Sequence, residues 1–207
     1  MSKGAYRKLG WGLLLTVIDI RIAQLDIIPD FVGYILIAAA LRTLSTEQEA
    51  FRRASWIAIP MIFLSMPDLI LPAVSAFIDI AAIPMKLHLY FQSMQALRLL
   101  MVYWIFQGMY ASARELRAFK LLNSIYNRRL LYLLVNVTLM AGYPFLFNME
   151  DSMELALIAA GVLAFILELL FIRLAFRMAK AEHQKPSGPG QTIDIRLLPH
   201  EGDTTHG

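Results

Sequence analysis

The stretch LLYLLVNVTLMAGYPFLF at residues 130–147 decides the fold class of this chain, because it contains no charged side chain. A helix that crosses the hydrocarbon core of a bilayer needs about 20 consecutive, mostly apolar residues. The stretch therefore predicts one membrane-spanning helix.

Five further segments share this apolar character, although the second is short and several contain a few ionisable residues. They lie at about residues 9–28, 31–44, 56–80, 87–110 and 155–176. The overall composition agrees, since 58% of the 207 residues are hydrophobic and only 17% are charged, against about 45–50% and about 25% in soluble domains. We expect an all-α fold, a polytopic membrane protein with a bundle of about six transmembrane helices.

The basic residues predict an orientation, because Lys and Arg concentrate on the cytoplasmic side of membrane proteins. With the N-terminus inside, the two chain ends and the connections after the second and fourth segments hold 16 of the 19 basic residues. We therefore expect both termini in the cytoplasm and the chain in the cell membrane. Residues 1–180 form the transmembrane domain, and the polar residues 181–207 form a flexible cytoplasmic tail.

Two other topologies are disfavoured. A single helix over residues 9–44 would be about 54 Å long, far more than one crossing needs, so we expect a tight turn just before a second helix that Pro29 opens. A re-entrant third segment would reverse every later segment and place five basic residues outside. The inner connection at residues 111–129 is amphipathic, which suits either a segment lying on an anionic leaflet or an ordinary basic connector.

Ionisable residues inside spanning segments are costly and usually face the bundle interior or a water-filled path. Those near the middle of their predicted helices form a candidate polar core: Asp19, Arg21, Asp68, Arg98 and Glu168. Those toward the outer side are Asp26, Asp30, Asp79 and His88. Two interpretations stay open. Either ion pairs clip the helices together, Asp68 with Arg98 and Glu168 with Arg21, or the surplus carboxylate serves transport or a proton relay.

The third segment is rich in proline, and each interior proline frees a backbone carbonyl one turn earlier. Asp68 directly follows Pro67, and a broken helix with an acid at the break is how many transporters build an ion site. A kink accommodated by neighbouring helices is the other interpretation. Small residues at 38–40 and at 156, 160 and 164 permit close helix packing, within one chain or in a homo-oligomer.

The sequence lacks the motifs of several common kinds of catalytic and binding site. The chain has no cysteine, which excludes disulfides and thiolate metal sites. It has no HExxH, P-loop, GxGxxG or GxSxG motif. We therefore assign no catalytic, cofactor-binding or metal-ligating residue, expect no cofactor, and lean against an enzyme. The net charge of +3 is explained by the basic residues expected on the cytoplasmic side, and it does not indicate binding of nucleic acid.

The segment LDIIPDFVGYILI at residues 25–37 follows a helix that bears Asp19. It resembles the opening of small multi-pass membrane proteins of unknown function from Gram-positive bacteria. The matching residues are Asp26, Pro29, Asp30, Phe31, Gly33 and Tyr34. The resemblance implies a bacterial cytoplasmic-membrane protein. Physically, Asp30 suits the positive N-terminal end of a helix, and Gly33 permits close packing.

These observations favour an integral membrane protein with a polar intramembrane core, as in a small transporter or a transporter subunit. The other interpretation is an accessory or regulatory membrane protein that does not transport. Its partners would be the lipid bilayer and either a membrane protein or a second copy of the chain.

Overall fold

The computed structural model describes residues 4–18, 21–22, 25–26, 30–67, 84–148 and 154–183. Within these residues the fold is α-helical, with six α-helices, one 3₁₀-helix and a pair of two-residue strands. The elements in chain order are α1 (Ala5–Leu15), β1 (Arg21–Ile22), β2 (Leu25–Asp26), α2 (Asp30–Leu44), α3 (Glu49–Leu64), α4 (Met85–Glu115), α5 (Phe119–Gly142), η3 (Tyr143–Asn148) and α6 (Glu154–His183). The predicted all-α class and the number of helices are confirmed.

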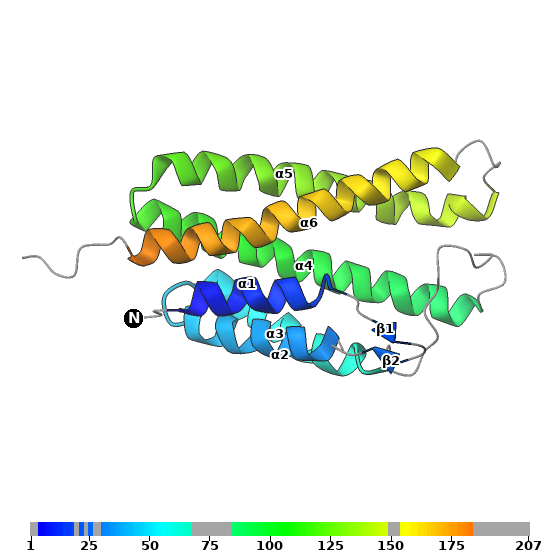
Figure 1. The fold of residues 1–207 in the computed structure, drawn as a ribbon, viewed down its shortest axis with the longest axis horizontal. Coiled ribbons are helices and arrows are strands. Elements are labelled where there is room, and N and C mark those ends of the chain that lie inside the picture. Colours follow the sequence, from blue (N-terminus) through cyan, green and yellow to red (C-terminus); the bar gives the residue numbers. More distant parts are fainter. Residues whose placement is uncertain are drawn as a thin grey trace, which may run out of the picture.

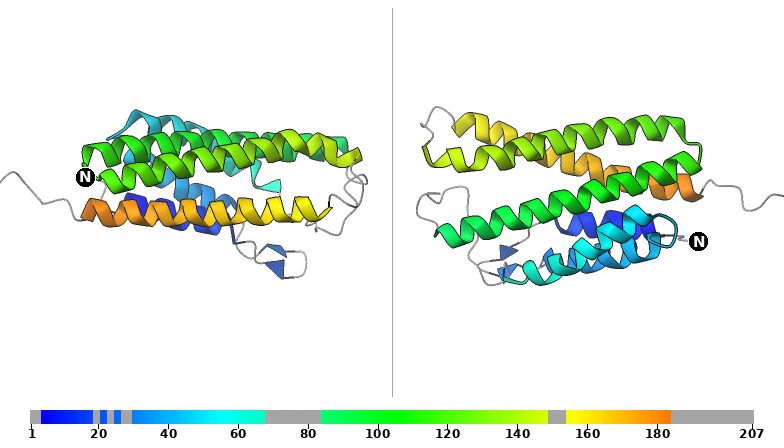
Figure 2. Two further views of the ribbon diagram at one scale, coloured as in Figure 1. Left: turned by 90° about the horizontal axis from the view of Figure 1, so that it is seen from above. Right: turned by 180° about the vertical axis from the view of Figure 1, so that it is seen from behind.

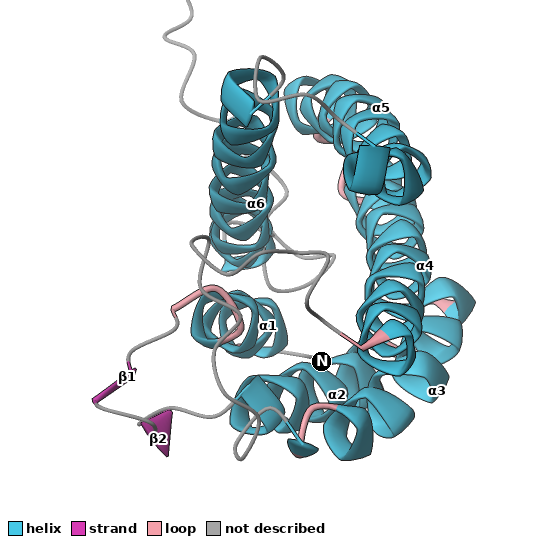
Figure 3. Cartoon of the chain, turned by 90° about the vertical axis from the view of Figure 1, so that its right-hand side faces the viewer, coloured by secondary structure: helices cyan, strands magenta, loops and turns pink. Residues whose placement is uncertain are grey.

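The six helices form a closed ring. Each helix packs against the next one along the chain, and α6 returns to pack against α1, as Figure 3 shows in a view along the bundle. Successive helices run in opposite directions. The start of α1, the α4–α5 turn and the end of α6 therefore share one end, the terminal end, while β1 and β2 mark the opposite strand end (Figures 1 and 2).

Three predicted spans are wrong in extent. The span expected at 130–147 is the second half of α5, which ends at Gly142, followed by η3. The other two end early for local reasons. The helix expected at residues 9–28 ends at Leu15, and β1 and β2 follow it. The run from Thr16 to Ile18 is β-branched and disfavours helix, and the Thr16 hydroxyl donates to the Leu13 carbonyl at 3.0 Å. The helix expected at 56–80 instead starts at Glu49 and ends at Leu64, just before Pro67. A helix usually ends ahead of a proline.

The predicted inner connection at 111–129 is also wrong as a separate segment, because helices occupy nearly all of it. α4 continues to Glu115 and α5 begins at Phe119. The turn between them places Arg117 in the left-handed region, with φ at 53°, and the Ala118 amide donates to the Ala113 carbonyl at 3.1 Å. This is a Schellman-type helix end.

Helix lengths divide the ring into two halves. α4, α5 and α6 have 31, 24 and 30 residues, about 46, 36 and 45 Å at 1.5 Å per residue. α1, α2 and α3 have only 11, 15 and 16 residues. Among the described residues, one helix is both long and apolar enough to cross a membrane, at Ala159–His183.

A close approach of two glycines joins α1 to α2. A Cβ built on Gly33 would lie 2.5 Å from Thr16 Cγ2 and 2.9 Å from the Gly12 carbonyl oxygen. A Cβ on Gly12 would lie 2.8 Å from Ile37 Cγ1. The two backbones therefore touch without intervening side chains, as expected for Gly33.

We predict that Gly33→Ala lowers the melting temperature of the purified protein. The new Cβ meets backbone atoms of α1 that cannot move aside as a side chain does, and overpacking of this kind costs about 1–3 kcal/mol. Gly161→Ala is the matched control, because nothing lies within 4 Å of a Cβ at that position. Equal melting temperatures for the two variants would contradict the close approach.

Candidate functional site

A carboxylate inside the ring joins the three long helices. Glu168 on α6 accepts a hydrogen bond from Arg98 Nη2 on α4 through Oε1, at 2.9 Å. Its Oε2 accepts from the Tyr132 hydroxyl on α5, at 2.7 Å. The side chains of Arg98 and Glu168 are 23% and 10% exposed. We call Arg98, Tyr132 and Glu168 the Glu168 cluster.

An amide pair continues this network on the side of the strand end. Gln95 Nε2, one turn before Arg98 on α4, donates to Asn136 Oδ1 on α5 at 3.2 Å. Asn136 Nδ2 in turn donates to the Tyr132 carbonyl at 2.9 Å. Because both amides are held, their dipoles keep fixed directions beside the Glu168 cluster.

Two cavities flank this network, and Gln95 and Arg98 line both of them. Cavity 1 has a volume of about 370 Å³ and lies between α2, α3, α4 and α5. Its polar wall consists of Asp30, Tyr34, Gln92, Gln95, Arg98 and Tyr143. Cavity 2 has a volume of about 280 Å³ and is lined by polar groups of α1, α4, α5 and α6: Thr16, Gln95, Arg98, Tyr132, Asn136 and Glu168.

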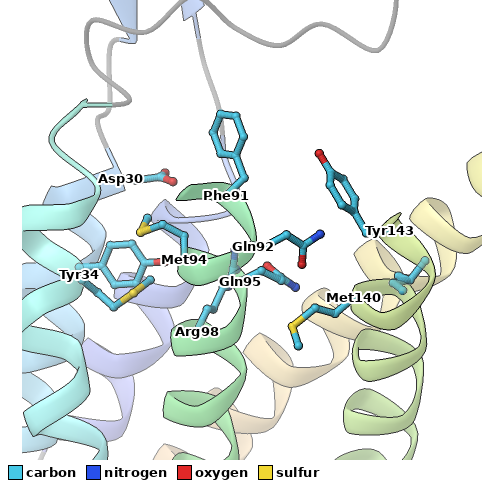
Figure 4. Close-up of a pocket in the computed structure, with 11 residues that line it drawn as sticks. Asp30, Tyr34, Phe91, Gln92, Met94, Gln95, Arg98, Met140 and Tyr143 are labelled. Atoms are coloured by element: carbon cyan, nitrogen blue, oxygen red, sulfur yellow. The ribbon is translucent and has the colours of Figure 1, made fainter. Parts of the chain in front are cut away.

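The polar side chains of α4 reach cavity 1 from a single face of that helix. Gln92, Gln95 and Arg98 are spaced by three residues and project toward the cavity, with Tyr34 on one side and Tyr143 on the other (Figure 4). Three-residue spacing places side chains on one helix face. His88 continues this face toward the strand end, where its Nδ1 lies 2.6 Å from the Tyr143 hydroxyl.

The structure brings together two of the five residues predicted for the polar core, Arg98 and Glu168. They pair with each other, which was not among the predicted pairings. Asp68, the partner predicted for Arg98, lies outside the described residues, and the pairing of Glu168 with Arg21 stays a prediction. Arg21 lies in β1, opposite Asp26 of β2, and these strands stand to one side of the helix ring in Figure 3.

The other residues predicted for the polar core and its outer side do not join the Glu168 cluster within the described part of the chain. Asp19, Asp68 and Asp79 lie outside the described residues. Asp30 begins α2 and lines cavity 1, and His88 is buried, with 4% of its surface exposed.

Sequence reasoning missed Tyr132 and Asn136, which lie in the uncharged stretch 130–147. A usable signal exists, because the two polar residues are four apart and share one helix face. Their hydrogen bonds show that this face points into the ring.

The site can bind polar groups. A guanidinium carries five N–H donors, and the contact with Glu168 uses one. The amides and tyrosine hydroxyls add donors and acceptors around cavity 1. Among the described residues, no group of three or more His, Asp or Glu side chains is placed to hold a metal ion.

We predict that Glu168→Gln lowers thermal stability strongly, because it leaves the Arg98 guanidinium without its counter-charge inside the ring. Removing one partner of a buried ion pair costs about 3–5 kcal/mol. Tyr132→Phe removes one hydrogen bond to a charged group and should cost less, about 1.5–3 kcal/mol. The measurement is thermal unfolding of the purified protein.

Glu49→Gln is the control for this prediction. Glu49 pairs with Arg52 and Arg53 at 3.2 Å on an exposed face of α3, and the hydrogen bond from Arg53 lowers the pKa of its carboxyl. Exposed pairs contribute little to stability, so this variant should melt almost as the parent does. Equal losses for Glu168→Gln and Glu49→Gln would contradict a supporting role for the Glu168 cluster.

Comparison of the chain with protein-family models, with curated proteins and with solved structures gives no match. The interpretation of the site therefore rests on the contacts described above.

Proposed function

We propose that this chain is a multi-pass membrane protein that binds a small polar solute inside its helix ring, as a small transporter or a transporter subunit. One observation carries the proposal. Arg98 lines both cavities and pairs with Glu168 across the ring.

The distribution of polar and apolar side chains supports a lipid environment. Large apolar side chains point outward and are exposed, including Trp56 at 72%, Phe63 at 63% and Leu134 at 62%. The ion pair and the amides lie inside. Extensive apolar surface is unusual on a soluble monomer, whereas lipid tails cover it without cost.

The position of the Glu168 cluster supports the same view. Glu168 lies near the middle of α6, which contains the apolar span Ala159–His183. Arg98 and Tyr132 lie well inside α4 and α5. Ionisable groups at such depth usually mark substrate or ion pathways, or pair with one another.

The size and lining of cavity 1 favour a small solute. Its volume of about 370 Å³ is at the lower end of the range for ligand pockets, about 300–1,000 Å³. Its wall combines a cation, an acid, two glutamines and two tyrosines with apolar residues. Such a lining supplies hydrogen bonds to a polar solute and excludes a purely apolar one.

The competing function is an accessory membrane protein that does not transport. It is favoured by the two hydrogen bonds of Glu168, which reach different helices and would hold the ring together without any solute. The two functions differ in whether Arg98 is needed for binding once the protein has folded.

We predict that the connections alternate across the membrane. Reporter fusions after Thr46, after Arg117 and at the C-terminus should report one side, and a fusion at Glu150 should report the other, because α2–α3, α4–α5 and the end of α6 share the terminal end. The Glu150 fusion reporting the same side as the C-terminal fusion would contradict the six-pass arrangement.

We predict that a small charged solute stabilises the parent protein through Arg98. The probes are small carboxylates paired with their neutral amides, and the measurement is the melting temperature of the chain in lipid nanodiscs. At least one carboxylate should raise it, and Arg98→Gln should abolish the rise because the cavity loses its cation.

Met94→Leu is the control, since Met94 lines the same cavity without charge and leucine has a similar volume. It should keep the response. The transporter proposal fails if no solute shifts the melting temperature and proteoliposomes take up no more of these solutes than empty liposomes do. The ion pair then serves the fold alone.

A further inference from the structure

Cations line the contact between α5 and α6 at the terminal end. On α5 the polar residues recur every fourth position, and on α6 they are spaced by four and three residues. They are Lys120, Ser124 and Arg128 on α5, and Arg173, Arg177 and Lys180 on α6. Residues at these spacings share one face of a helix, so each helix presents a basic face.

Two hydrogen bonds show that these faces meet. Arg177 Nη1 donates to Ser124 Oγ at 3.4 Å, and Arg128 Nη1 donates to the Leu170 carbonyl at 2.8 Å. The helices are antiparallel, and α6 crosses α5 obliquely (Figure 1).

A cleft opens between them where α5 begins and α6 ends. Its volume is about 500 Å³. The cations Lys120, Arg177 and Lys180 line it together with the apolar side chains of Phe119, Leu121 and Ala181. One cleft thus combines three positive charges with an apolar wall.

Among the residues that the structure describes, no acidic side chain lines this cleft. Helix α5 contains no Asp or Glu, and none of the ion pairs in the described part of the chain includes Lys120, Arg177 or Lys180. At the same end, Glu115 accepts a hydrogen bond from Gln48, and Glu49 pairs with α3 arginines.

The cations also repel one another. Arg128 on α5 stands near Arg173 and Arg177 of α6, so three like charges lie close together. Like charges at this spacing repel one another. An anion placed among these groups would reverse that effect.

We propose that this cleft binds the phosphate headgroup of an anionic phospholipid. The cations match the phosphate, and the apolar wall matches the glycerol and the first acyl carbons. Basic pockets between membrane helices bind lipid headgroups in this way. The proposal goes beyond solute binding and rests on the membrane location proposed above.

The surroundings favour a lipid over a soluble anion. Arg173, Arg177 and Lys180 lie in the last part of the apolar span Ala159–His183, where a membrane helix leaves the hydrocarbon. On α5, Phe119 is 75% exposed, Tyr126 48% and Leu130 60%. These side chains give the acyl chains an apolar surface next to the cations.

The test is native mass spectrometry of the full chain in detergent. The probes are phosphatidylglycerol, phosphatidylcholine with the same acyl chains, and glycerol 3-phosphate as the soluble phosphate. Phosphatidylglycerol should bind at least tenfold more tightly than the other two. Each single variant, Lys120→Gln, Arg177→Gln or Lys180→Gln, should weaken it about fivefold, and the triple variant about 100-fold.

Arg114→Gln and Lys86→Gln are the matched controls. Arg114 is an exposed cation at the same end but outside the cleft, and Lys86 is one at the strand end. Both should bind phosphatidylglycerol as the parent does. Size-exclusion profiles and melting curves show whether each variant folds. If the triple variant does not fold, the binding of phosphatidylglycerol by the three single variants tests the proposal.

Three results would overturn the proposal. Equal binding of the two phospholipids would show that the cleft does not recognise the charge of the headgroup. Equal binding by glycerol 3-phosphate would replace the lipid with a soluble anion. Unchanged binding in the cleft variants would place the lipid elsewhere. Each of these leaves solute binding at Arg98 intact, whereas a chain recovered in the soluble fraction would overturn the membrane location as well.

Discussion

The structure depends on the carboxylate of Glu168, because both of its oxygens accept hydrogen bonds and the donors come from two other helices. The carboxylate lies inside the ring, where an unpaired charge would be costly. It therefore fixes where α4, α5 and α6 stand relative to one another. The short helices α1 and α2 are held differently, by the backbone contact at Gly12 and Gly33.

The Glu168 cluster belongs to a longer polar seam between α5 and α6. Every fourth residue of α5 from Lys120 to Asn136 is polar, and three of them hydrogen-bond across the seam: Ser124 with Arg177, Arg128 with the Leu170 carbonyl, and Tyr132 with Glu168. Rows at four-residue spacing form the ridges by which helices pack. The seam thus runs from the exposed cations of the terminal end to the amides beside the two cavities.

Hydropathy predicted the number of helices because each helix contains one apolar segment, wherever that helix begins and ends. It could not predict the ends of two helices, because these depend on the β-branched run after Leu15 and on Pro67. Sequence also identified Arg98 and Glu168 as costly charges without showing that they pair, since spacing gives the face of a helix and not its neighbour. Tyr132 and Asn136 were missed because uncharged polar residues barely alter the hydropathy of an apolar stretch.

Arg98 would serve both the proposed solute binding and the stability of the ring, because it lines both cavities and pairs with Glu168. An anionic solute in cavity 1 and the Glu168 carboxylate would compete for the same guanidinium. As the solute takes Arg98, Glu168 keeps the hydrogen bond from the Tyr132 hydroxyl but loses its counter-charge. Under the proposed function, binding of an anion would therefore open the ion pair between α4 and α6. A neutral solute has no such effect, because it leaves the ion pair closed.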